Sequence, residues 1–93
     1  MIDLASRPCL ASKARLRFDA RSGKQMLLYP ERGLELTDSA SRIVALCAEG
    51  RTVAAIVDAL VAASGEPRAR LEDEVLTFLR ALDERGLLTE TTP

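Results

Sequence analysis

Histidine is absent from this chain of 93 residues, and aromatic residues make up only 3 % of it. Without histidine, the sequence lacks the commonest general base and the commonest metal ligand, and it excludes Ser/His/Asp and Cys/His catalytic sets. The five glycines stand singly, so the chain has no glycine-rich phosphate loop. We therefore predict a protein that is not an enzyme and that uses no cofactor and no metal.

Cysteine is also scarce, and Cys9 and Cys47 lie too far apart for a CxxC redox or zinc motif. Such usage is typical of reduced thiols in a cytosolic protein. The longest apolar stretch, Val53–Ala63, is interrupted by Asp58 and is shorter than the ~20 residues of a membrane span. The N-terminus shows no signal-peptide pattern. We expect a cytoplasmic protein with no membrane partner.

What the first part of the chain does contain is strand-like alternation of apolar and polar residues. Ala14–Asp19 alternates strictly, and Ala20–Lys24 follows as a hairpin turn. Gln25–Tyr29 is apolar on both faces, as in a central strand. Pro30–Gly33 predicts a second turn, and Leu34–Thr37 alternates again. The pattern predicts three short antiparallel strands.

The apolar period then changes to that of helices, which predicts three of them. The first begins at Thr37 or Asp38 and ends at Gly50. Thr52 caps the second, which ends in Ser64–Pro67, and the third runs from Pro67 to Gly86. The apolar stripe of the third helix consists of Leu71, Val75, Phe78, Leu79 and Leu82.

Strands followed by helices indicate an α+β fold, here a three-stranded antiparallel sheet followed by three helices in a winged helix-turn-helix-like arrangement. Residues 13–88 form the expected single domain. Because Pro8 opposes regular structure locally, we expect residues 1–12 to form an irregular N-terminal arm. Residues 89–93 are expected to be a frayed tail.

A winged-helix shape raises the hypothesis of a DNA-binding regulator. However, 13 basic and 14 acidic residues give a net charge of −1, whereas phosphate-binding domains normally have a basic excess. The third helix, which would enter the major groove, carries Glu72, Asp73, Asp83 and Glu84. The arginines of the first strand form a better basic cluster, but we expect no nucleic-acid partner.

The last strand supports a different hypothesis, because it is expected to lie at an edge of the sheet. Leu34–Leu36 carries only Glu35 as a charge that would blunt such an edge. An open edge beside an apolar helix is a docking site for an extended peptide, which adds a strand to the sheet. The alternative is an edge shielded by the third helix, by the N-terminal arm or by a second copy of the chain.

Three segments in this order also resemble a known family. Leu27–Leu36 ("LLYPERGLEL"), Ala45–Leu60 ("ALCAEGRTVAAIVDAL") and Phe78–Leu88 ("FLRALDERGLL") look like the PqqD family of pyrroloquinoline quinone (PQQ) biosynthesis, and Arg15–Asp19 fits its first strand. The resemblance covers about residues 8–88. The family often has tryptophan where Gln25 stands, which leaves a related recognition domain of another peptide-modifying pathway as an alternative.

The resemblance implies a peptide chaperone, the type case of a precursor-peptide recognition element. Such a domain binds the ribosomally made precursor peptide by strand addition and presents it to a radical S-adenosylmethionine (SAM) enzyme, without a cofactor of its own. A homodimer is a further alternative for an open edge. The family's groove, carried onto this chain, assigns these peptide-binding residues: Leu34, Glu35, Leu36, Thr37, Arg68, Leu71, Glu74, Val75 and Phe78, with Arg70 as a second basic candidate. Leu36→Pro is expected to abolish peptide binding by removing a strand donor.

Overall fold

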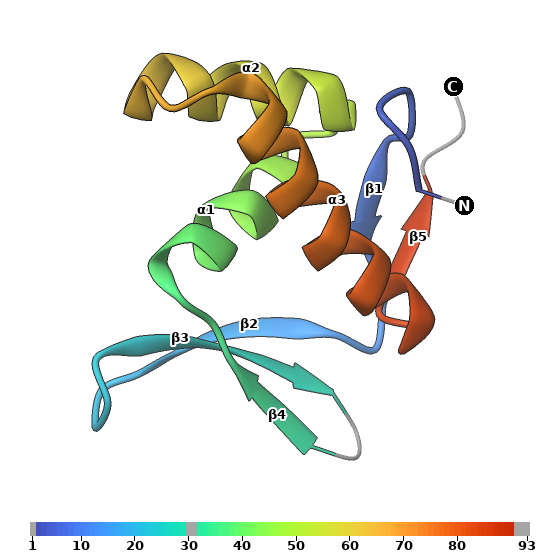
Figure 1. Cartoon of the computed structure of the whole chain (residues 1–93). Helices are drawn as coiled ribbons and strands as arrows, with labels where there is room; N and C mark the ends of the chain where they lie inside the picture. Colours follow the sequence, from blue (N-terminus) through green and yellow to red (C-terminus); the bar gives the residue numbers. More distant parts are fainter. Residues whose placement is uncertain (1, 30–31, 91–93) are drawn as a thin grey trace.

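The computed structural model describes residues 2–29 and 32–90. Its elements are, in chain order, β1 (Pro8–Leu10), β2 (Arg15–Asp19), β3 (Lys24–Tyr29), β4 (Arg32–Glu35), α1 (Asp38–Cys47), α2 (Val53–Ser64), α3 (Arg68–Glu84) and β5 (Leu88–Glu90). Figure 1 shows the β2–β3–β4 sheet beneath the helices and the β1–β5 pair beside α3. The expected α+β class and the three-stranded antiparallel sheet are confirmed.

The strand order in the three-stranded sheet is β2-β3-β4, so β3 is central and the other two strands are edges. Opposite residues include Leu16 and Leu27 on β2 and β3, and Leu27 and Leu34 on β3 and β4. Residues paired directly across strands share a face of the sheet. Because Leu27 is fully buried in the core, this row marks the face that the helices cover.

The helices begin where the sequence predicts, because threonine side chains cap two of them. Thr37 accepts a hydrogen bond from the Ala40 amide, and Thr52 accepts one from the Ala55 amide, both at 3.1 Å. α2 ends at Gly65, whose φ of 71° lies in the left-handed region. The buried faces of the three helices meet over Leu27 and Leu36 in one apolar core.

The N-terminal arm contains a short strand, which corrects part of the expectation of an irregular segment at residues 1–12. Pro8–Leu10 is a strand that pairs antiparallel with Leu88–Glu90. Pro8 starts this strand, where the missing amide hydrogen costs little. The carbonyls of Ser6 and Leu4 accept hydrogen bonds from the first two amides of α2, at 2.9 Å each. The arm therefore satisfies helix amides that would otherwise lack partners.

Two further boundaries differ from the expectation. Thr89 and Glu90 belong to β5 and are not frayed, whereas residues 91–93 lie outside the described residues. The last strand of the three-stranded sheet is Arg32–Glu35 and not Leu34–Thr37, because Thr37 is used as the cap of α1. Pro30 and Glu31 of the expected second turn lie outside the described residues.

Candidate functional site

The outer edge of β4 is the first component of the site. The Leu36 amide donates to the Gln25 carbonyl at 2.9 Å, which fixes the phase of the β3–β4 ladder. In an antiparallel ladder, residues alternate between pairs that are hydrogen-bonded to the neighbouring strand and pairs that are not. Leu36 is in a hydrogen-bonded pair with Gln25, and Leu34 is in the next such pair. The residues between and before them, Glu35 and Gly33, therefore point their N–H and C=O groups away from β3. These two residues offer two donors and two acceptors to an added strand.

An apolar surface accompanies this edge on the helix side of the sheet. Leu34 shares the face of Leu27, and it is half-buried against the core. Phe78 of α3 is half-buried against the same core, and Tyr29 of β3 is as well. Both α3 and β4 therefore contribute apolar side chains that are only partly covered. A strand added to β4 would cover more of this apolar area.

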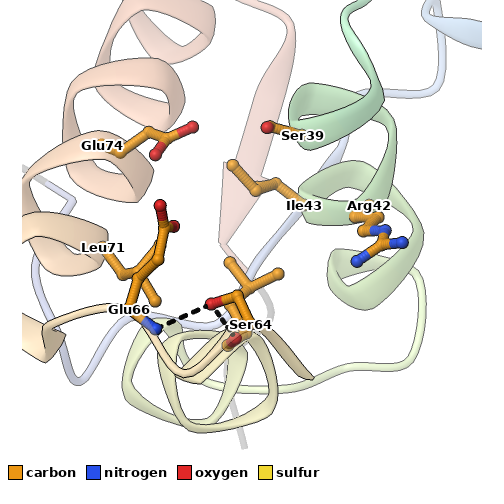
Figure 2. Close-up of a pocket in the computed structure, with 8 residues that line it drawn as sticks. Ser39, Arg42, Ile43, Ser64, Glu66, Leu71 and Glu74 are labelled. Atoms are coloured by element: carbon orange, nitrogen blue, oxygen red, sulfur yellow. Dashed lines mark hydrogen bonds between the residues drawn. The ribbon is translucent and has the colours of Figure 1, made fainter. Parts of the chain in front are cut away.

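A small cavity lies between the helices that follow β4 (Figure 2). It has a volume of about 80 Å³, and its lining consists of Ser39, Arg42, Ile43, Leu60, Ser64, Glu66, Leu71 and Glu74. This is smaller than the roughly 150 Å³ cavities that take up benzene, so it suits part of one side chain and not a cofactor. Ser39 lies four residues after the end of β4, in the first turn of α1.

The floor of the cavity is apolar and its rim is polar. Ile43, Leu60 and Leu71 supply the apolar atoms. In Figure 2, the side chains of Glu74 and Ser39 face one another across the opening. The Ser64 hydroxyl donates to the Leu60 carbonyl at 2.8 Å and accepts from the Glu66 amide at 3.2 Å, which shapes the loop between α2 and α3.

The charged candidates are largely engaged with partners inside the chain. Glu35 forms an ion pair with Lys24 at 2.9 Å, and the hydrogen bond to this carboxylate raises the pKa of Lys24. Arg68 pairs with Asp58 and Glu72, and its hydrogen bond to Asp58 raises the pKa of the guanidinium. The guanidinium of Arg70 lies 3.9 Å from the Glu66 carboxylate, in a looser exposed pair.

The structure separates the predicted site residues into surface and core. Leu36 and Val75 are 2 % and 0 % exposed, so their side chains belong to the core. Thr37 is exposed, but its hydroxyl is the α1 cap. Leu71 is buried and lines the cavity, and Glu74 is exposed at the cavity rim. Leu34 and Glu35 keep accessible surface on the edge strand, and Phe78 of α3 is only partly buried against the core.

Sequence reasoning missed Gly33 and the cavity residues of α1. Gly33 was missed because the strand begins at Arg32, before the expected Leu34, and because the phase of the ladder is visible only in the hydrogen bond between Leu36 and Gln25. The cavity residues Ser39 and Arg42 carry no sequence signal, since their position depends on how α1 packs against α3. Among residues 2–29 and 32–90, no group of three or more His, Cys, Asp or Glu could hold a metal ion. No helix within these ranges is long and apolar enough to cross a membrane.

The comparisons with known proteins agree with the resemblance read from the sequence. The family model described as coenzyme PQQ synthesis protein D (PqqD) matches residues 24–88. A PqqA binding protein of Rhodopseudomonas palustris (strain TIE-1) is 42 % identical over 91 residues, which cover 95 % of this chain and 89 % of the relative. One from Pseudomonas paraeruginosa (strain DSM 24068 / PA7) is 40 % identical, with 82 % of each chain covered.

Two solved structures share the fold. The solution structure of the PqqD truncation of Methylobacterium extorquens PqqCD, described as a stand-alone recognition element for ribosomally synthesized and post-translationally modified peptides, has a TM-score of 0.82. It is 31 % identical, and the match covers 96 % of this chain and 95 % of that one. TbiB1, solved in complex with the TbiA(beta) leader peptide, has a TM-score of 0.77 at 26 % identity, with 91 % and 99 % covered.

Proposed function

Because this chain belongs to the PqqD family, we propose that it binds the precursor peptide of PQQ biosynthesis as an added strand on β4. The observation that carries this proposal is the open edge at Gly33 and Glu35, on a strand whose Leu34 is half-buried against the same core as Phe78 of α3. The relatives' description as PqqA binding proteins supports PqqA as the peptide. The leader peptide held by TbiB1 supports a leader segment as the part that binds.

The peptide would lie between β4 and α3 in our proposal. Its backbone would bond to Gly33 and Glu35, while alternate side chains would contact Leu34 and Phe78 on the helix side. The cavity beyond the end of β4 would receive one side chain, with Leu71 in its floor and Glu74 at its rim. Arg68 and Arg70 would contribute less than expected from the sequence, because acidic neighbours already pair with them.

The proposal extends to the partner that would act on the peptide. We propose that the bound peptide is presented to a radical SAM enzyme, that the domain itself is not an enzyme, and that it works in the cytoplasm without a cofactor. The lack of histidine and of a catalytic set supports this division of labour. A homodimer is also proposed, and β2 is the strand that would carry it. None of the relatives supports the alternative of a winged-helix DNA-binding regulator.

The experiment is a titration of the isotope-labelled protein with the precursor peptide, observed by amide-resolved NMR. We expect the amides of Gly33 and Glu35 and those of α3 around Phe78 to shift, while the amides of β2 stay in place. A mixed DNA duplex at low salt serves as the comparison ligand. Salt-sensitive shifts with DNA and none with peptide would contradict the proposal and favour the regulator.

One substitution tests the strand-addition geometry directly. Glu35→Pro removes an outward N–H and leaves the inward ladder intact, so the affinity for peptide should fall at least about tenfold. Glu35→Ala is the matched control, because it removes the ion pair with Lys24 but keeps the amide. The Leu36→Pro test is wrong for this purpose, because the Leu36 amide bonds inward to Gln25. Equal affinities for the two Glu35 variants, with both folded, would rule out strand addition on β4.

A further inference from the structure

The cavity between α1, α3 and the loop that joins α2 to α3 combines an apolar floor with a rim of hydrogen-bond acceptors. The floor consists of Ile43, Leu60 and Leu71. Above it, Figure 2 shows the carboxylates of Glu66 and Glu74 and the hydroxyl of Ser39 turned toward the opening. Such a cavity suits a side chain that is apolar along its length and polar at its tip.

The two carboxylates at the rim are weakly neutralised by the fold itself. Glu74 is exposed, and its carboxylate forms no ion pair or hydrogen bond within residues 2–29 and 32–90. Glu66 has only the loose pair with Arg70, at 3.9 Å. By contrast, Arg68 neutralises both Asp58 and Glu72. The rim therefore holds negative charge that is open to a ligand.

Arg42 also lines the cavity, but it does not cancel this charge. In Figure 2, its guanidinium lies on the other side of Ile43 from Glu66 and Glu74. Arg42 also borders a second hollow, together with Lys24 and residues of the first turn of α1. With two carboxylates and one guanidinium, the lining of the cavity keeps a net negative charge.

We propose that this cavity receives a basic side chain of the bound peptide, a lysine above all, and that Glu74 is the residue that selects it. The inference rests on the proposed function, because the side chain has to belong to a peptide held on β4. The aliphatic stem of the lysine would cover Leu60 and Leu71, and its ammonium group would reach the rim.

The chemistry of the rim favours lysine over the other classes of side chain. An ammonium group has three donors and no acceptor, and Ser39, Glu66 and Glu74 present acceptors to it. An acidic side chain would meet two like charges, which opposes its ionised form. An apolar side chain would remove water from the carboxylates without replacing their hydrogen bonds. The cavity thus distinguishes peptides by charge, which the backbone groups of β4 cannot do.

The position of the cavity restricts where the basic residue can stand in the peptide. Ser39 follows Glu35, the last outward residue of β4, by four positions, so their Cα atoms are at most about 14 Å apart. An extended peptide covers that distance in about four residues. The basic residue should therefore stand within about four residues of the one that pairs with Glu35. Its side chain would fix the register of the added strand, which repeating backbone groups specify only weakly.

The test pairs peptide variants with protein variants, and fluorescence anisotropy gives the affinities. Each lysine and arginine of the precursor peptide is replaced in turn by glutamine, and we expect one replacement to lower the affinity at least about tenfold. Glu74→Gln should cause a similar loss with the unmodified peptide and little further loss with that glutamine peptide. Glu74→Lys should bind best a peptide with glutamate at the same position.

Asp73→Asn is the matched control, because it makes the same charge change at the neighbouring exposed position of α3, outside the cavity lining. We expect it to change the affinity less than about twofold, since exposed charges are largely screened by salt. Both positions are exposed, so folding is preserved and is checked by circular dichroism.

The outcomes separate this inference from the proposed function. If the peptide binds and shifts the amides of Gly33 and Glu35, but every glutamine peptide binds equally well, the inference is overturned and strand addition stands. Equal affinities of Glu74→Gln and Asp73→Asn for the unmodified peptide would overturn it as well. A peptide that does not bind at all would overturn both.

Discussion

The two edges of the three-stranded sheet have the same backbone chemistry but different side chains. β4 carries Gly33 and Glu35 at its outward positions, with the Glu35 carboxylate tied to Lys24. β2 carries Leu16 and Phe18 at the corresponding positions, and both are well exposed. Leu34 of β4 and Phe78 of α3 are half-buried against the same core. At β2, the exposed Phe18 borders an open hollow whose α1 side consists of Asp38, Ser41 and Arg42.

The difference teaches that an open edge does not by itself specify its occupant. The β4 edge offers backbone groups and an adjoining apolar surface, which suits an extended peptide whose side chains supply the contacts. The β2 edge supplies its own apolar and charged side chains in a self-complementary order, which suits a copy of itself. The four predictions below test whether the two edges are independent.

The largest effect is expected from a substitution in β3, the strand that lies between the two edges. Leu27 is fully buried at the centre of β3, so Leu27→Ala should lower the free energy of unfolding by about 2–5 kcal/mol. Both edges should lose their function together because β3 positions both of them. Chemical denaturation followed by circular dichroism measures the loss. A variant that keeps full stability would mean that the sheet is not anchored through Leu27.

The next effect is expected from two substitutions, each of which should impair one edge and leave the other unchanged. Glu35→Pro should weaken peptide binding at least about tenfold and leave self-association unchanged, and Phe18→Lys should do the reverse. Fluorescence anisotropy of a labelled precursor peptide and sedimentation of the same samples give the two readouts. If either variant impairs both activities while circular dichroism shows an intact fold, the edges are coupled and the comparison fails.

A smaller effect is expected from a rise in pH. It should lower the stability of the core, on which both edges depend. Burial raises the pKa of the Cys47 thiol from 9.0 to about 12, with a lesser contribution from Cys9. The unfolded chain therefore loses this proton first as the pH rises, so the stability contribution is intact below pH 9 and decreases between pH 9 and 12. Cys47→Val should show a shallower decline over that range. Identical pH profiles for the two proteins, measured by denaturant titration, would contradict the buried, protonated thiol.

The smallest effect is expected from removing the ion pair between Lys24 on β3 and Glu35 on β4. Lys24 and Glu35 are both more than half exposed, and exposed pairs contribute little to stability. Lys24→Ala should change the midpoint of thermal unfolding by less than about 2 °C and should not change the peptide affinity. A clear loss of affinity would show that the charge, and not only the backbone of Glu35, takes part in binding.

Much of the fold follows from local patterns that the sequence displays openly. The alternation at Arg15–Asp19 and the caps Thr37 and Thr52 act over a few residues, so they identify strands and helix starts without tertiary information. The N-terminal arm escaped prediction for the opposite reason. Its strand partner, Leu88–Glu90, lies some 80 residues away, and the need of the α2 amides for acceptors is visible only in three dimensions.

The sequence alone determined the class of this protein: it indicates a small α+β domain, and it carries a family resemblance that the comparisons confirm. Only the tertiary structure decided which side chains of the apolar stripe of α3 remain accessible, because packing buries Val75 completely and leaves Phe78 partly exposed. It also decided the phase of the ladder. That phase depends on which residue first bonds across the sheet, and the Leu36–Gln25 hydrogen bond turns Gly33 and Glu35 outward.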